Sequence, residues 1–349
     1  MPIVMAKETD IDIKRTYQQY IRKKKTFLFF LLLLLVICSI ISLHVGSSKM
    51  TAVESFAVLL GNENATLREI IFQIRLPRLL GGLLIGMNLA LSGLIIQSSL
   101  NNPLASPTTI GISSASAAGA NVALILFSRW GIERNLWLTA LSSFLMAMAC
   151  MSLVLLISNL RTANKTTVVL AGTAFHALFL AFITIIQYFA DDTELASAVA
   201  WTFGDLGRVH FDEIVILAVV TALSVLCMYA LRWQMNALDM GEQSAHSLGI
   251  PVRHLRNLCI LIAALNTGVS VAFAGIIGFV GLLAPQMTKR LIGEDKRFMI
   301  PAALLSGACI VLASDALARV VVAPLVLPVG AVTSLFGAPL FLYVLLKGR

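Results

Sequence analysis

The stretch IRLPRLLGGLLIGMNLALSGLIIQSSL, residues 74–100, decides the fold. Two arginines, Arg75 and Arg78, open it, and the apolar run behind them is long enough to cross a bilayer as one helix. Pro77 suits the first turn of a helix, where its missing N–H costs nothing. Arginine is among the costliest side chains to place near lipid. The stretch therefore predicts a spanning helix that begins beside two charges, and these charges need an explanation.

The composition of the whole chain indicates a membrane protein. Of its 349 residues, 58% are hydrophobic and 13% are charged, and the mean hydropathy is +0.89. Soluble domains carry about 25% charged residues, so one soluble core could not bury this much apolar surface. The five cysteines and five histidines are scattered, which predicts no disulfide, metal site or cofactor. We expect an all-α, multi-pass membrane protein.

Ten apolar stretches are long enough to be membrane helices, at roughly 17–25 residues each. They lie near residues 26–45, 71–97, 109–128, 136–158, 166–189, 212–231, 257–275, 276–292, 299–319 and 329–346. The join between the seventh and the eighth is the least defined, because the sequence there is continuous and rich in glycine. Residues 1–25 form a basic tail, which we expect in the cytoplasm, and residues 26–349 form one transmembrane domain.

The charge distribution orients these helices. If both termini are cytoplasmic, 18 of the 26 basic residues lie inside and 8 outside, whereas 7 acidic residues lie inside and 10 outside. This is the asymmetry expected of membrane proteins, whose cytoplasmic loops are enriched in lysine and arginine. The net charge of +8 is thus explained by topology, and we expect no nucleic-acid partner.

Three arginines, Arg75, Arg78 and Arg319, fall on the outer face, against that rule. Arginines at a helix N-terminus also oppose the helix dipole, so a specific partner is expected for Arg75 and Arg78. Anchoring to lipid headgroups is the alternative. Arg319 has a further explanation, because Asp315 precedes it by four residues in the favourable acid-first order. A structural ion pair is therefore as well supported for Arg319 as a docking role.

Small and polar residues follow the two arginines along the same helix. Gly82 and Gly86 begin a small-residue stripe of the kind that lets helices approach closely in lipid. Asn88 and Ser92 share one face, and Gln97 lies further along. These three polar residues are candidates for lining a transport pathway. Hydrogen bonds that merely join helices are an equally good explanation.

Several motifs follow in a specific order. They are RLPR (75–78), NNPLASPTTIG (101–111), LDMGEQSAHSLGI (238–250), GFVGLLAP (278–285), SDALAR (314–319), LPVG (327–330) and FGAPLF (336–341). Together they resemble the FecCD-type permeases of ATP-driven (ABC) importers for iron–siderophores, haem and vitamin B12. One departure is Gln286, at a position where the family commonly has histidine.

The resemblance implies a location, a bacterial cell (plasma or inner) membrane, and a set of partners. Such a permease pairs with a second copy or a sister permease in the lipid bilayer, two cytoplasmic ATPase subunits drive it, and an extracytoplasmic binding protein delivers the cargo. The resemblance assigns Arg75 and Arg78, with Arg319 as a third, to docking acidic residues of the binding protein. It assigns the inner segment 238–250 to coupling with the ATPases. The matching positions of that segment are Gly241, Glu242, Ala245, Leu248 and Gly249.

The function implied is permeation of an iron–siderophore, such as a ferric hydroxamate, by alternating access. Haem or vitamin B12 are alternative cargoes. The chain has no G-x-x-x-x-G-K-[ST] loop, so we expect a transporter subunit that is not itself an enzyme. An ion-coupled secondary transporter is a rival. Such proteins usually place ionisable residues at mid-membrane, whereas the predicted spans here have almost none, except Asp315 near the end of one span. An intramembrane enzyme would need a nucleophile with a base, or paired metal ligands, which the spans do not offer.

Overall fold

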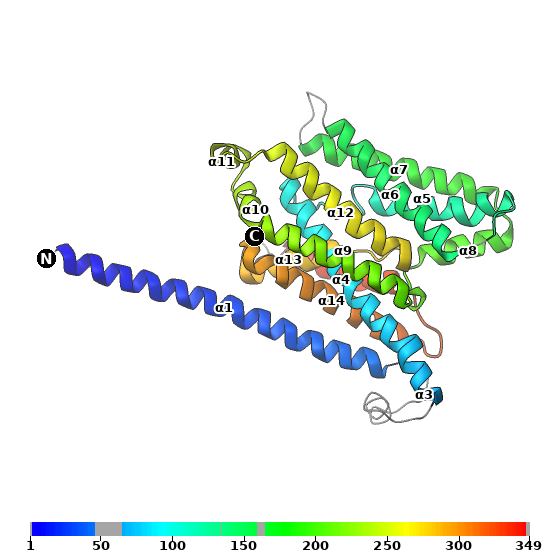
Figure 1. Ribbon diagram of the computed structural model, residues 1–349, viewed down its shortest axis with the longest axis horizontal. Coiled ribbons are helices and arrows are strands. Elements are labelled where there is room, and N and C mark those ends of the chain that lie inside the picture. Colours follow the sequence, from blue (N-terminus) through cyan, green and yellow to red (C-terminus); the bar gives the residue numbers. More distant parts are fainter. Residues whose placement is uncertain (1, 46–64, 134, 159–164, 347–349) are drawn as a thin grey trace.

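The computed structural model describes residues 2–45, 65–133, 135–158 and 165–346, and these residues are almost entirely helical (Figure 1). The longer helices are α1 (Pro2–His44), α4 (Leu76–Leu100), α6 (Leu136–Ser158), α7 (Lys165–Tyr188), α9 (Phe211–Ala230), α12 (Val252–Ala274), α14 (Lys296–Val320) and α15 (Val329–Leu346). The shorter ones are α3 (Ala65–Glu69), α5 (Ile112–Asn121), α8 (Asp192–Thr202), α10 (Arg232–Asp239), α11 (Glu242–Ser247) and α13 (Val280–Ile292). Two π-helical segments, η1 (Ile70–Arg75) and η2 (Val122–Phe127), and the 3₁₀ turn η3 (Leu206–Arg208) complete them.

All ten predicted spans contain a helix, and the all-α membrane architecture is confirmed. Among the described residues, seven helical segments are long and apolar enough to cross a membrane, and 112–127 and 329–343 are shorter apolar helices. The basic tail and the first span form one continuous helix, α1, whose N-terminal half extends clear of the other helices in Figure 1. We name the two ends of the bundle inner and outer after the orientation that the charges predict.

The eighth predicted span, 276–292, is the one that differs most from expectation. Helix α13 starts only at Val280, and its 13 residues rise about 20 Å, less than the bilayer core of about 30 Å. The preceding residues are not helical: Ile276 is bridged to Phe203, and Phe279 has a left-handed conformation with φ of 64°. Gly275 has a positive φ of 75° and lies so close to the Trp201 carbonyl that an added Cβ would be 2.6 Å from it. The glycine-rich sequence therefore ends α12 at Ala274 and lets the chain pass close to the end of α8.

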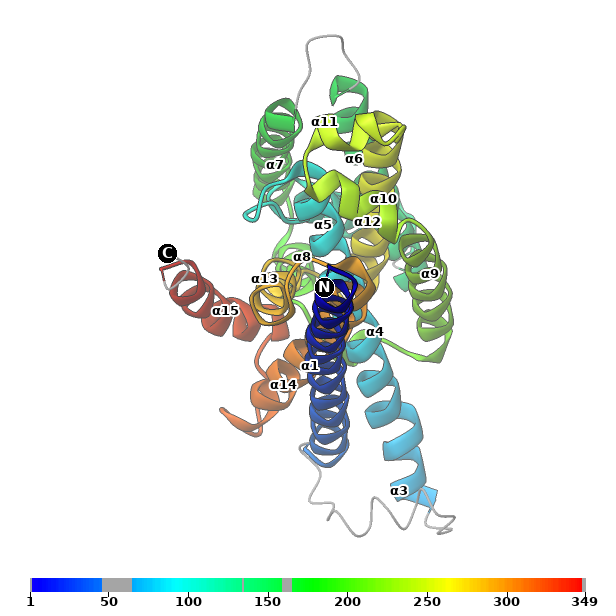
Figure 2. The ribbon, with the colours of Figure 1, turned by 90° about the vertical axis from the view of Figure 1, so that its left-hand side faces the viewer.

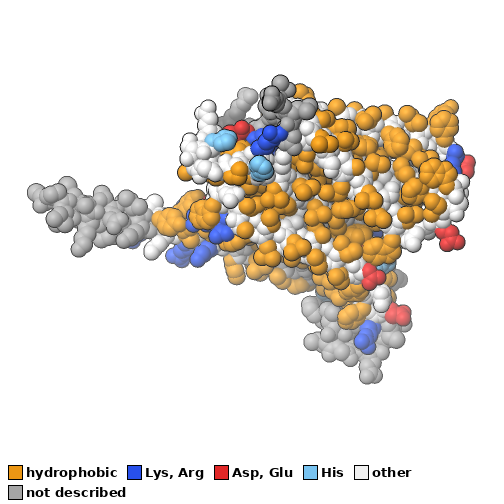
Figure 3. Space-filling view, turned by 45° about the horizontal axis from the view of Figure 1, so that its top comes forward, with side chains coloured by type: hydrophobic (Ala, Val, Ile, Leu, Met, Phe, Trp, Pro, Cys, Tyr) orange, Lys and Arg blue, Asp and Glu red, His pale blue; other side chains and the backbone are white. Residues whose placement is uncertain are grey.

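Three helices form the centre of the bundle. The most apolar windows of α4, α12 and α14 are 78%, 72% and 72% buried, whereas those of α1, α6, α7 and α9 are only 17–33% buried. Helix α4 packs against α14, α12, α13 and α9, and α1 lies along α14 (Figure 2). The peripheral helices therefore carry the apolar outer surface, which dominates the face seen in Figure 3.

The small-residue stripe of α4 makes this packing possible. A Cβ added to Gly86 would lie 2.5 Å from the carbonyl oxygen of Gly307 on α14, and one on Gly93 would lie 1.6 Å from that of Gly281 on α13. Real Cβ atoms cannot come so close, so both backbones are in contact only because glycine is present on each side. The predicted close approach of helices is confirmed.

This contact yields a prediction for Gly93→Ala. The added methyl must push α4 away from α13, so the variant should lose folded yield and melt earlier, by the equivalent of about 1–3 kcal/mol of overpacking. Gly268→Ala on α12 is the matched control, because its methyl would meet side chains only, the nearest being a Phe144 ring atom at 3.3 Å. Equal thermal midpoints for the two variants would contradict this view of the packing.

Candidate docking and coupling sites

At the outer end, the carboxylate of Asp315 joins two arginines from different helices. Asp315 on α14 is completely buried, and its Oδ1 accepts from Nε and Nη2 of Arg78 at 2.9 and 2.8 Å. Its Oδ2 lies 2.7 Å from Nη2 of Arg319, one turn further along α14. The ion pair predicted from the four-residue spacing is confirmed. The partnership with Arg78, 237 residues away, was not predicted.

The remaining donors of these arginines reach the outer end of α1. Arg75 donates from Nη1 to the carbonyl of Leu43 at 2.6 Å, and Arg319 donates from Nη1 to that of Ser42 at 3.0 Å and also to that of Val45. The last four carbonyls of a helix have no partner within it, and cations near a helix C-terminus are favoured by the dipole. The arginines therefore cap α1.

The three arginines predicted to dock a partner are largely buried in this arrangement. Arg75 and Arg319 are only 4% and 8% exposed, and the side chain of Arg78 is 13% exposed. Arg78 also lies 3.6 Å from Asp205, whose side chain is 42% exposed. All three arginines thus hold the bundle together. Their docking role stays a prediction, and Arg78 is the one whose side chain is most accessible.

At the inner end, the segment 238–250 forms the end of α10, a turn and α11. Gly241 has a φ of 114° and Gly249 one of 75°, conformations that favour glycine and explain both residues. Ala245 is buried, and Glu242 forms an ion pair with Arg256 of α12. Arg256 also donates from Nε to the carbonyl of Ser99 at 3.2 Å. The segment is therefore fastened to the inner ends of α12 and α4.

The same segment presents apolar side chains outward. Met240 and Leu248 are 74% and 67% exposed at the inner end of the bundle. Two exposed apolar side chains on one short segment make it a candidate contact site for another protein. Of the five residues assigned to coupling, Leu248 faces outward, whereas Glu242 and Ala245 hold the segment in place.

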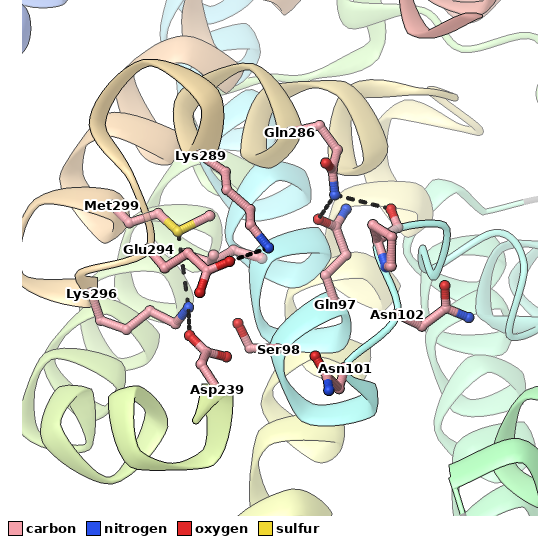
Figure 4. A pocket seen from close by; sticks show the side chains of 12 residues that line it. Gln97, Ser98, Asn101, Asn102, Asp239, Gln286, Lys289, Glu294, Lys296 and Met299 are labelled. Atoms are coloured by element: carbon pink, nitrogen blue, oxygen red, sulfur yellow. Dashed lines mark hydrogen bonds and ion pairs between the residues drawn. The ribbon is translucent and has the colours of Figure 1, made fainter. Parts of the chain in front are cut away.

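Beside this segment lies a small polar cavity of about 80 Å³, formed by the inner ends of α4, α10, α13 and α14 (Figure 4). Lys296, which is almost fully buried, pairs there with Asp239. Across the cavity, Nε2 of Gln286 donates to Oε1 of Gln97 at 2.8 Å and to the carbonyl of Pro103 at 3.1 Å. Gln286, at the position where histidine was expected, thus links α13 to the end of α4. Sequence reasoning had not singled out Lys296.

The other two candidate pathway residues lie within helix contacts. Asn88 is fully buried, and its Oδ1 accepts from Thr221 of α9 at 2.8 Å. Ser92, also buried, donates to the carbonyls of Asn88 at 2.8 Å and of Ala263 on α12 at 3.0 Å. The bonds to Thr221 and to Ala263 join α4 to α9 and α12, which agrees with the alternative that these polar residues serve to connect helices. A pathway role for Asn88 and Ser92 stays a prediction.

Comparison with known proteins decides the family. The sequence profile of the FecCD transport family matches residues 34–347. The chain belongs to the FecCD transport family. It is 43% identical, over 97% of its length and 99% of the relative, to a protein described as an ABC transporter permease from Methanocaldococcus jannaschii. It is 34% identical to the hemin transport system permease of Yersinia pestis, over 89% of this chain and 93% of that one.

A solved structure agrees with these relatives. It is described as an inward-facing conformation of a metal-chelate type ABC transporter, and it superimposes with a TM-score of 0.82 at 31% identity, over 93% of this chain and 99% of that one. Other relatives are named for vitamin B12 and molybdate import. The FecCD protein is thus an ABC transporter permease and a multi-pass protein of the cell membrane, as the motifs predicted. The family match begins at residue 34, earlier than the first motif.

The outer cluster of this permease predicts a clear difference between two aspartates. Asp315→Asn should lower stability strongly, because removing one partner of a buried ion pair costs about 3–5 kcal/mol. Asp205→Asn should cost less than about 1 kcal/mol, since that residue is half exposed and its pair is long. Thermal unfolding of the purified variants in one detergent measures both. Similar midpoints for the two would contradict the central role of Asp315.

Proposed function

We propose that this permease imports an iron–siderophore. The observation that carries the proposal is the structural match, at 31% identity over 93% of the chain, with a transporter described as being of the metal-chelate type. A ferric hydroxamate is the specific cargo we favour. A metal held inside an organic chelator needs no ligands from the permease, which agrees with spans that are rich in glycine, alanine, serine and leucine and poor in charge.

Growth on defined iron sources tests the cargo. Cells that lack this chain should fail on a ferric hydroxamate as sole iron source and recover when the chain is restored, while growth on simple ferrous salts stays unchanged. The hemin permease relative, 34% identical, makes haem the second candidate. Growth that is lost on haem but kept on every siderophore would contradict the iron–siderophore proposal and support haem.

We further propose that two ATPase subunits bind the inner end through α10 and α11 and drive alternating access. The exposed Met240 and Leu248 suit a groove on such a partner. The bond of Arg256 to Ser99 and its ion pair with Glu242 connect this contact to α4 and α12. Movement of α11 would thus reach the central helices. A second permease subunit, identical or a sister, would complete the pathway.

Leu248→Asp tests the ATPase contact. A charge placed in an apolar contact should weaken it by about 2 kcal/mol or more, so the ATPase should be lost when the tagged permease is purified. Leu325→Asp is the matched control, because Leu325 is equally exposed but lies at the outer end. Equal ATPase recovery with both variants would rule out α11 as the docking element.

The docking role of the outer arginines is proposed for Arg78 first. An arginine can hold a carboxylate through two parallel hydrogen bonds, and Arg78 already does this in part with Asp315. A carboxylate on the delivery protein would approach Arg78 from the side on which Asp205 lies, 3.6 Å from Nη2 of Arg78. Arg75 and Arg319 are buried and would not contact the delivery protein directly. They would contribute positive charge near Arg78 and hold α1 in place.

Arg78→Gln should therefore weaken binding of the cargo-loaded delivery protein by about 2 kcal/mol, or about thirtyfold in Kd. The measurement is titration of the delivery protein onto the assembled transporter. The control is Arg129→Gln, which removes another outer arginine that pairs with carboxylates, Glu194 at 3.6 Å and Asp191 at 4.0 Å. An unchanged Kd for Arg78→Gln in a folded complex would contradict the docking role.

A further inference from the structure

Two adjoining hollows lie on the surface of the bundle, the larger between α6, α9 and α12 and the smaller between α6, α8, η3 and α12. The larger, of about 330 Å³, is lined almost wholly by apolar side chains, among them Trp137, Phe144, Val220 and Val269. The smaller, of about 260 Å³, lies nearer the outer end and adds polar groups. The larger hollow alone is within the size range of small-molecule sites, which begins at about 300 Å³.

The two hollows meet at Ala272 and Phe273, which line both. Trp137 packs edge-on against the ring of Phe273, with 5.9 Å between ring centroids and 82° between planes. Tryptophan is enriched where membranes meet water, so this pair places the junction at the outer membrane surface. The apolar hollow then lies within the outer leaflet, and the polar one lies at headgroup level.

The polar hollow contains one cation, Arg208, together with Asn135, Thr139 and Ser197. Arg208 caps the end of α8, where Nη1 donates to the carbonyl of Trp201 at 3.2 Å and Nη2 to that of Ala200 at 2.5 Å. A guanidinium has five N–H donors, so these two bonds leave donors for a ligand. Burial lowers the pKa of Arg208 and the charge of Asp205 raises it. A bound anion would likewise favour the charged form.

We propose that these joined hollows bind one anionic phospholipid, with its phosphate at Arg208 and an acyl chain along the apolar hollow. The surrounding helices expose large apolar side chains, such as Leu141, Val219 and Leu223, and so face the lipid. An open apolar hollow at that depth is filled by acyl chains. The cation at its polar end matches the negative phosphate, since arginine holds phosphate through two donors.

Such a lipid would be part of the fold rather than of the cargo route. Its headgroup would join α6, α8 and η3 at the outer end, and its chain would fill the space between α6, α9 and α12. Binding of this kind stabilises the folded protein by an amount that rises with the logarithm of lipid concentration over Kd. The site therefore has two separable parts, a charge and a hollow, which two different variants can remove.

Native mass spectrometry of the full-length protein tests the proposal, after equilibration with equal amounts of phosphatidylglycerol and phosphatidylcholine. The wild-type chain should keep one phosphatidylglycerol with a severalfold preference. Val220→Phe, which fills the apolar hollow, and Arg208→Gln, which removes the charge, should each lose that preference. Val219→Phe, on the next and more exposed position of α9, and Arg129→Gln should keep it. Thermal unfolding shows that each variant is folded.

Three results would overturn the proposal. The first is no preferred phosphatidylglycerol on the wild-type protein. The second is loss of the preference in Arg208→Gln but not in Val220→Phe, which would mean a headgroup contact without a site for the chain. The third is that Val220→Phe separates a dimer into single chains, which would make a second copy the occupant of the hollow.

Discussion

A buried carboxylate between two arginines is the interaction on which the outer half of this permease depends. Asp315 has no exposed surface, so its charge is tolerable only because Arg78 and Arg319 neutralise it at hydrogen-bond distance. The arginines have more donors than one carboxylate can accept. Those of Arg319, together with Arg75, reach the last carbonyls of α1. The same cluster therefore neutralises the buried Asp315 and caps α1, and it joins α1, α4 and α14.

Helix α4 connects this cluster to the inner end. It continues directly from α3 and η1, so Arg75 and Arg78 lie within one helical segment rather than at its start. It contacts α14 and α13 through glycine on both sides, and Gln286 and Arg256 attach near its inner end, at Gln97 and at the Ser99 carbonyl. At these contacts the backbones meet without intervening side chains, so α4 is tightly packed against α13 and α14. The two ends at which partners are proposed to bind are thus connected by one central, closely packed helix.

The sequence was sufficient for the architecture and for local pairs. Length and hydropathy located the helices, the glycine stripe indicated close packing, and the four-residue spacing predicted the pair of Asp315 with Arg319. The charge asymmetry singled out the three arginines as misplaced. The sequence could not reveal that Arg78 and Asp315 are paired, because they are 237 residues apart and only tertiary packing brings them together. For the same reason, the capping of α1 by Arg75 and Arg319 was not foreseen.

Two further features were beyond sequence reasoning. The stretch before Val280 is as apolar as a membrane helix, but it is not helical, with positive φ at Gly275 and Phe279 and a close approach of Gly275 to the Trp201 carbonyl. Hydropathy does not register such backbone contacts. Lys296 looked like an ordinary inner-loop cation, yet it is buried against Asp239 of α10. The partner of a buried charge is set by the fold and not by neighbours in the chain.

Hydrogen–deuterium exchange at the outer end of α1 tests the central claim most directly. The comparison is between the wild-type protein and Asp315→Asn, in amides of residues 38–45. If the Asp315 cluster holds α1, loss of the carboxylate should let Arg319 and Arg78 shift and the last turns of α1 fray, so that these amides exchange faster while those of α12 stay protected. Unchanged exchange in α1 would contradict the claim that this cluster fixes the outer end of the bundle.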